Sequence, residues 1–225
     1  MAKTETKRTP LSRARVLTAA VDLADRDGVG TLSMRRLASE LGVVPMALYK
    51  HVANKEELLG AMLDVVVEEF DPPRTDLGWK EAVRERILSA REALLRHPWA
   101  SRVMETRTEP TPIVMAYMDS MIGMFRTGGF SIELTHHAMH AMGSRLMGFS
   151  QELFNDQSDT DPAIEAEMFT QLAQVYPSIY ELYVSITHDD ASVVGPGCDD
   201  RFEFEFALDL MLDGLERMRV AADHA

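Results

Sequence analysis

Apolar residues recur every three to four positions in almost every long segment of this 225-residue chain. That period matches the turn of an α-helix, and the alternating, β-branched runs that strands require are missing. We therefore expect an all-α fold. The spacing, together with the glycines and prolines that end helices, predicts helices over residues 12–28, 33–40, 45–51, 54–70, 79–97, 99–106, 112–127, 131–154, 162–188 and 199–221.

Two adjacent prolines in the segment 71–76 divide the chain. Proline removes a backbone donor and pushes the residue before it out of helical conformation, so the helices on either side cannot be continuous. We expect a small helical domain over residues 1–70, in which residues 1–10 form a disordered arm. A larger helical bundle is expected over residues 71–225.

The composition is typical of a cytoplasmic protein. Hydrophobic residues make up 46% of the chain and charged residues 26%, as in folded globular proteins. The lone Cys198 cannot close an intrachain disulfide, and the first residues are not followed by the apolar run of a secretory signal. The longest uncharged stretch near the middle, residues 134–144, is well short of the roughly 18 apolar residues of a membrane span. We therefore expect no membrane partner.

Charge is distributed unevenly along the chain. The net charge of −13 taken alone argues against binding to nucleic acid, because affinity for a phosphate backbone comes largely from Lys and Arg. Residues 1–60, however, carry ten Lys/Arg against seven Asp/Glu, or +3, whereas the remaining 165 residues carry 13 against 29, or −16. This change of sign predicts two modules and an anionic partner for the first. The alternative is an uneven surface without functional meaning.

Residues 31–51 have the layout of a helix-turn-helix motif, two short helices around a turn at Gly42. The apolar side chains that would pack against the preceding helix are Leu37, Ala38, Leu41, Val43 and Leu48. The second short helix would enter the major groove of double-stranded DNA by its N-terminal end. The next helix adds free backbone N–H groups beside Lys55, which suit a phosphate. The candidate DNA-binding residues are Arg35, Arg36, Val44, Pro45, Met46, Tyr49, Lys50, His51 and Lys55.

As a set, residues 11–63 resemble the DNA-binding domain of the tetracycline-repressor (TetR) family. The resemblance rests on Thr31-Leu32, Leu37-Ala38, Leu41-Gly42-Val43, Leu48-Tyr49, His51 and Lys55-Glu56-Glu57-Leu58-Leu59. It continues more weakly through most of the remaining chain, for example in Gly129-Phe130-Ser131. The resemblance implies a homodimeric transcriptional repressor on a palindromic operator. It also implies release from the operator when a small-molecule effector enters the C-terminal regulatory and dimerisation domain.

The start of the second short helix departs from the family pattern. Many members have Ser or Thr there, followed by polar side chains, whereas residues 44–47 read Val-Pro-Met-Ala. We expect these four residues to contact bases mainly through van der Waals forces, for example with thymine methyl groups. Arg35 then becomes the best direct reader of a base, unless its charge is simply solvated. Tyr49 and Lys55 are expected to contact phosphates.

Methionine is concentrated in the larger domain, where 11 of the 15 methionines follow residue 70. Flexible methionine side chains can repack around ligands of different shape, although each one can equally be core filling. We expect a largely hydrophobic effector with one polar or anionic end near Arg107 or a histidine. Because the TetR resemblance places Val103 where tetracycline repressors have a magnesium-binding His, magnesium-tetracycline is not expected. The candidate effector-binding residues are Trp99, Met104, Arg107, Met118, Met121, His136, His140, Phe149 and Glu152.

Two of the expected helices carry apolar seams with steps of three and four residues, over residues 139–153 and 204–218. Burial within one chain explains one such stripe per helix. A second apolar flank, with Phe202, Phe206 and Leu210, predicts a partner chain, and the resemblance implies a dimeric four-helix bundle. The candidate dimer-interface residues are Met142, Leu146, Gly148, Leu153, Leu208, Met211, Leu215 and Met218.

A helical metal-dependent enzyme is the alternative function. His136 and His140 have the i, i+4 spacing that can bind a transition metal, and His137 lies between them. The glutamate of the His-Glu-x-x-His pattern is absent, and the sequence fixes no strong third ligand. We therefore expect no enzymatic activity, no bound metal and no other cofactor.

Overall fold

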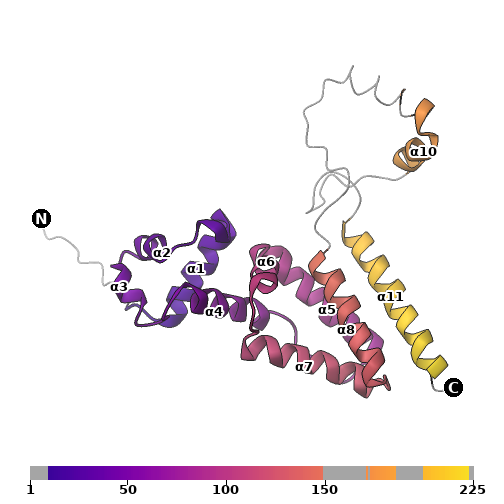
Figure 1. The fold of residues 1–225 in the computed structure, drawn as a ribbon, viewed down its shortest axis with the longest axis horizontal. Coiled ribbons are helices and arrows are strands. Elements are labelled where there is room, and N and C mark those ends of the chain that lie inside the picture. Colours follow the sequence, from indigo (N-terminus) through magenta and orange to yellow (C-terminus); the bar gives the residue numbers. More distant parts are fainter. Residues whose placement is uncertain (1–9, 149–170, 172, 186–199, 223–225) are drawn as a thin grey trace, which may run out of the picture. The chain divides into compact units, whose positions relative to one another are not determined.

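The computed structural model confirms the expected all-α fold (Figure 1). It describes residues 10–148, 171, 173–185 and 200–222. Every regular element in these ranges is a helix. The helices predicted over residues 99–106 and 112–127 agree with the structure to the residue. Helical periodicity therefore located the elements of this chain well.

The N-terminal elements are α1 (Arg13–Asp27), the 3-10 helix η1 (Val29–Thr31), α2 (Met34–Glu40), α3 (Pro45–Leu48) and α4 (Lys55–Glu68). Ser12 begins α1 as predicted, because its hydroxyl accepts a hydrogen bond from the N–H of Arg15 at 3.2 Å. Gly28 ends α1 with φ +78°. Periodicity could not predict η1, since a three-residue element is shorter than one helical repeat.

The turn of the helix-turn-helix motif depends on Gly42. Its φ of +66° lies in the left-handed region, and the N–H of Val43 closes the end of α2 on the Ala38 carbonyl at 2.9 Å. A Cβ at Gly42 would meet nothing within 4 Å, so the backbone conformation and not crowding favours glycine. Helix α3 ends at Leu48, three residues earlier than expected, where the N–H of His51 donates to the Leu48 carbonyl as a tight turn.

Helix α4 begins with a variant of the predicted capping box. The Asn54 side chain accepts a hydrogen bond from the N–H of Glu57 at 2.8 Å, as expected. The Glu57 carboxylate, however, accepts from the N–H of Ala53 at 2.6 Å instead of from that of Asn54. An additional hydrogen bond from Arg13 at 3.0 Å holds the carboxylate on this side.

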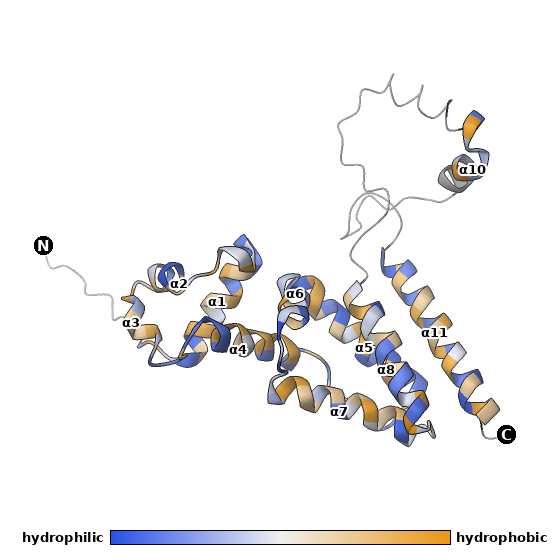
Figure 2. Ribbon diagram, in the orientation of Figure 1, coloured by the Kyte–Doolittle hydropathy of each residue, from blue (hydrophilic) through white to orange (hydrophobic). Residues whose placement is uncertain are grey.

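Helix α4 packs against helices that precede it and helices that follow it in the chain. It lies against α1 at the N-terminal end and also contacts α5 (Trp79–Arg96), α6 (Trp99–Thr106) and α7 (Pro112–Thr127). Its middle is strongly hydrophobic, as Figure 2 shows. Helix α4 therefore connects α1, which precedes the helix-turn-helix motif, to α5, α6 and α7.

An aromatic cluster joins the start of α5 to the end of α7. The rings of Trp79, Phe125 and Phe130 lie with their centroids 4.6 to 5.9 Å apart in edge and tilted arrangements. Gly128 follows α7 at a point where a Cβ would lie 2.6 Å from the Cβ of Trp79. Glycine is therefore required there by the close approach of α5, and α8 (Ile132–Gly148) starts just beyond.

The chain divides into two compact units, Met1–Met139 and His140–Ala225. This division differs from the boundary expected at residues 71–76, because α4 packs directly against α5, α6 and α7. The second unit contains the end of α8, α10 (Pro177–Ser185) and α11 (Asp200–Ala222).

The helix predicted over residues 162–188 is interrupted. Pro177 starts α10, as a residue without an N–H can do at the first position of a helix, and Tyr176 before it is not helical. Residues 149–154, 162–170, 172, 186–188 and 199 of the predicted helices lie outside the described residues.

Candidate nucleic-acid interface

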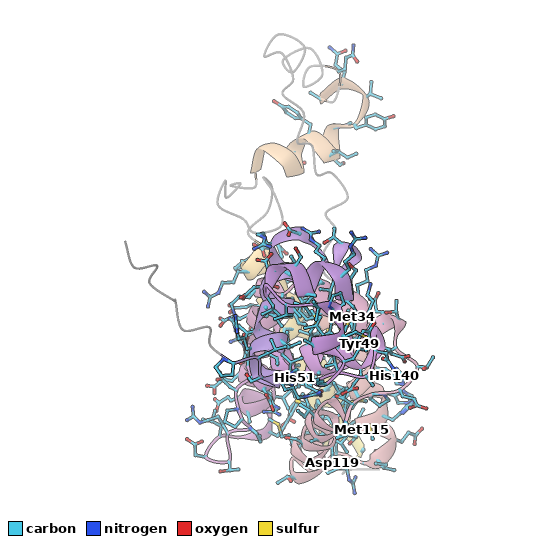
Figure 3. The ribbon with its side chains drawn as sticks, turned by 90° about the vertical axis from the view of Figure 1, so that its left-hand side faces the viewer. Met34, Tyr49, His51, Met115, Asp119 and His140 are labelled. Atoms are coloured by element: carbon cyan, nitrogen blue, oxygen red, sulfur yellow. The ribbon has the colours of Figure 1, made fainter. Side chains whose placement is uncertain are left out.

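Large apolar side chains are exposed at α3. Val44 is 67% exposed, Met46 is 71% exposed and Tyr49 is 44% exposed, whereas Leu48 beneath them is fully buried. Figure 3 looks onto this end of the chain, with Tyr49 and His51 labelled. A solvent-exposed apolar patch at the start of the second helix of a helix-turn-helix motif is suited to the major groove.

The two arginines at the start of α2 differ in their surroundings. The Arg36 guanidinium donates to the Asp27 carboxylate at 2.6 Å, so an ion pair inside the domain engages it. Arg35 is exposed and forms no hydrogen bond or ion pair with the residues that the structure describes. Arg35 is therefore the freer of the two to reach a base. The other exposed candidates are Pro45, Lys50 and Lys55, and His51 is half-buried.

Arg13 is a residue of this surface that sequence reasoning missed. Its guanidinium donates to the His51 carbonyl at 2.6 Å and to the Glu57 carboxylate at 3.0 Å, so it fastens the turn between α3 and α4 to α1. The hydrogen bond from the Ala53 N–H, together with Arg13, lowers the pKa of Glu57. In the sequence, the position of Arg13 at the start of an amphipathic helix does not indicate these contacts.

The loop after α6 contacts the first turns of α4. The Arg107 guanidinium donates to the Glu56 carbonyl at 3.2 Å, and a Cβ at Gly60 would lie 3.1 Å from it. The Thr111 hydroxyl, at the start of α7, donates to the Asp64 carboxylate further along α4. Arg107, the candidate to bind the anionic end of an effector, thus lies where the loop after α6 meets α4.

A second junction involves α1, the end of α4 and the connection between α5 and α6. The Asp25 carboxylate accepts a hydrogen bond from the indole N–H of Trp99 at 2.6 Å and lies 2.9 Å from His97 Nδ1. His97 Nε2 lies 3.1 Å from the Glu69 carboxylate, which Arg96 also contacts at 2.7 Å. Trp99 and His97 are buried, whereas the side chains of Asp25, Glu69 and Arg96 are 28%, 34% and 54% exposed, so the network runs from the interior to the surface.

The remaining effector candidates lie on three helices. Met121 is buried, Met104 is half-buried, and Met118 is exposed. His136 and His140 are exposed on α8. Phe149 and Glu152 lie outside the described residues.

The histidines of α8 show no metal site within the described part of the chain. The rings of His136 and His137 are 5.5 Å apart, and the described residues hold no group of three or more His, Cys, Asp or Glu that could bind a metal ion. Separately, none of the described helices is both long and apolar enough to cross a membrane.

The candidate dimer residues differ in their exposure. Met142, Leu208 and Leu215 are already buried within the chain, and Leu146 and Met211 are half-buried. Met218 and Gly148 are exposed, and Leu153 lies outside the described residues. The flank formed by Phe202, Phe206 and Leu210 is more than half exposed at each residue, and the first two rings stack with centroids 6.3 Å apart. This flank, which we call the α11 stripe, is unburied in the single chain.

The helix-turn-helix motif, its exposed α3 and the helical domain joined to it through α4 define a helix-turn-helix transcriptional regulator. Residues 16–62 match the model of bacterial regulatory proteins of the tetR family, and residues 72–219 match the tetracyclin repressor-like C-terminal domain. The chain therefore belongs to the TetR family. It is 33% identical over 217 residues to the transcriptional repressor DrrR1 of Streptomyces coeruleorubidus, covering 92% of this chain and 77% of that protein.

Solved structures agree with this assignment. ActR from Streptomyces coelicolor without ligand superposes with a TM-score of 0.73 at 28% identity, covering 95% of this chain and 99% of that one. ActR has also been solved in complex with actinorhodin, with a TM-score of 0.69 at 26% identity, 94% of this chain and 99% of that one. BioQ with its double-stranded DNA operator gives a TM-score of 0.61 at 26% identity, 92% of this chain and 98% of that one.

Proposed function

We propose that this chain is a cytoplasmic transcriptional repressor that binds a palindromic operator as a homodimer and is released by a small, largely hydrophobic effector. The observation that carries the proposal is the exposed apolar end of α3, together with the exposed Arg35 of α2, in a helix-turn-helix motif of the TetR family. The operator complex of BioQ and the actinorhodin complex of ActR support the two partners.

The operator would be read by a mixture of contacts. Val44 and Met46 offer only methyl and thioether groups, which suit the 5-methyl group of thymine, and Arg35 can donate two hydrogen bonds to guanine. Tyr49, Lys50, His51 and Lys55, with Arg36, would contact the sugar-phosphate backbone and fix the register.

Release would depend on the two junctions. Arg107 and Thr111 connect the loop and helix after α6 to α4, and Trp99 connects α6 to Asp25 of α1. An effector can shift the protein off DNA only if it binds the DNA-incompetent conformer more tightly. We place the effector between the helices of the regulatory domain, near Met104, Met118, Met121 and His136. Trp99 and Arg107 would then transmit its binding.

Dimerisation would bury the α11 stripe. Three large apolar side chains on one helix face are stabilised by removal from water, and the steps of four residues from Phe202 to Leu210 suit a helix-helix interface. Two chains joined in this way would present two copies of α3, which a palindromic site requires.

Selection of bound DNA from a random library, with the dimer kept intact, tests the proposal. We expect two inverted half-sites with centres about 34 to 36 Å apart, or a multiple of that distance. Arg35→Ala should relax preference at one base pair per half-site by about 1 to 3 kcal/mol, whereas Lys55→Ala should weaken all sequences alike. Arg102→Ala, an exposed arginine of α6, is the control. The proposal fails if no sequence is enriched and binding does not weaken with salt.

A further inference from the structure

Arg86 is a buried cation that pairs with no anion among the described residues. It lies in the middle of α5 and is only 7% exposed. Its Nη1 donates to the Asp71 carbonyl, and its Nε has no hydrogen-bond partner. Within the described part of the chain no carboxylate forms an ion pair with it, and the exposed Asp71 carboxylate acts on it only from a distance.

The surroundings of Arg86 are aromatic. Its guanidinium lies over the ring of Tyr117 on α7, 4.8 Å from the centroid, and Phe70 packs edge-on against the same ring at 5.2 Å. Burial raises the pKa of Tyr117 to about 12, and burial lowers the pKa of Arg86.

An arginine stays protonated in proteins, so its burial leaves an uncompensated charge unless a counter-ion is present. A backbone carbonyl and an aromatic ring compensate only part of the cost. The Nε–H is one edge of the planar fork with which arginine binds carboxylates in a bidentate manner, and here that donor is unused. An anionic group could use this donor.

We propose that Arg86 binds the acidic group of an aromatic effector, whose rings pack against Tyr117 and Phe70. This inference rests on the proposed function, since it names the ligand class and a receiving residue in the regulatory domain. It replaces Arg107, whose guanidinium contacts the Glu56 carbonyl at α4. Arg86 also donates a hydrogen bond to the carbonyl of Asp71, just beyond the end of α4. An anion bound to the guanidinium would compete with this hydrogen bond and so loosen that end of α4.

The test uses the full chain and the isosteric pair 2-naphthoate and 2-naphthamide as probes. Naphthoate should raise the Tm of the wild type, and the uncharged naphthamide should raise it much less. Arg86→Met should abolish the preference for the acid, which corresponds to a loss of affinity of about ten- to a hundredfold in calorimetry. Arg102→Met, which removes an exposed arginine from α6, should keep the preference.

Stability without ligand separates a binding role from a structural one. An apolar side chain of similar length in place of an unpaired buried charge should leave the Tm unchanged or raise it. If Arg86→Met lowers the Tm by more than about 10 °C or does not fold, Arg86 is structural and the inference is wrong. Arg86→Lys, which keeps the charge without the Nε–H, should bind naphthoate about tenfold more weakly than the wild type.

Other results would also overturn the inference. An anion site at Arg86 is excluded if neither probe shifts the Tm, or if the acid and the amide shift it equally. It is also excluded if Arg86→Met still prefers the acid. Failure of the proposed function is a different observation, namely absence of salt-dependent operator binding by the unliganded wild type. An Arg86-dependent naphthoate shift would stand even then.

Discussion

Replacing Asp25 with alanine removes one carboxylate that serves two buried groups. The indole N–H of Trp99 and the Nδ1 of His97 both face it, and these two side chains are 5% and 8% exposed. Leaving a buried donor unpaired costs about 1 to 3 kcal/mol. Because the Asp25 side chain is 28% exposed, water can replace part of the loss, and we expect about 2 to 4 kcal/mol in all.

Thermal denaturation followed by circular dichroism, at one protein concentration, measures this loss. For a chain of this size 1 kcal/mol corresponds to about 2 to 4 °C, so Asp25→Ala should lower the Tm by about 5 to 15 °C. The control is Asp22→Ala, an exposed aspartate on the same helix, which should stay within about 0.5 kcal/mol of the wild type. Equal Tm values for the two variants would refute the reasoning that the Asp25 carboxylate stabilises the fold by pairing two buried groups.

Two further predictions concern Glu69 and the dimer. Partial burial works against ionisation of Glu69, but hydrogen bonds from a neighbouring arginine and histidine outweigh it and lower its pKa from the ordinary 4.5. The contribution of Glu69 to stability is therefore complete above pH 4.5 and is lost as the pH falls through its lowered pKa. The Tm difference between the wild type and Glu69→Gln should accordingly disappear in acid. Glu68→Gln should show no such trend. In sedimentation, Phe206→Glu should give monomers because it places a charge in the α11 stripe. A Phe206→Glu variant that stays dimeric would move the interface to the seam that contains Met218.

Local chemistry made the helix-turn-helix motif predictable. Ser12, Gly28 and Gly42 act through bonds to residues at most five positions away, so each helix limit is encoded in a short stretch of sequence. The exposure of Met46 followed in the same way, because the apolar residues around it predicted which face packs against the preceding helix.

The junctions could not be read from the sequence, because their partners are far apart in it. Asp25 and Trp99 are separated by 74 residues, and Arg107 reaches Glu56 across 51 residues. The expectation that Arg107 lies near the effector rests on its charge, which is visible in the sequence, whereas the carbonyl that it contacts is not. Nothing in the sequence distinguished Arg86 from the other arginines of α5, since burial depends on how α5 meets α7.

The position of Trp99 makes the junction optically observable. The chain has two tryptophans, and the other, Trp79, lies in the aromatic cluster at the opposite end of α5. In a Trp79→Phe variant, all indole emission would come from a ring bonded to the Asp25 carboxylate and 6.2 Å from the His97 ring. Indole emission responds to the polarity and charge around the ring, so movement of α6 away from α1 would shift its wavelength. An unlabelled sample could thus report in real time when operator or effector changes this contact.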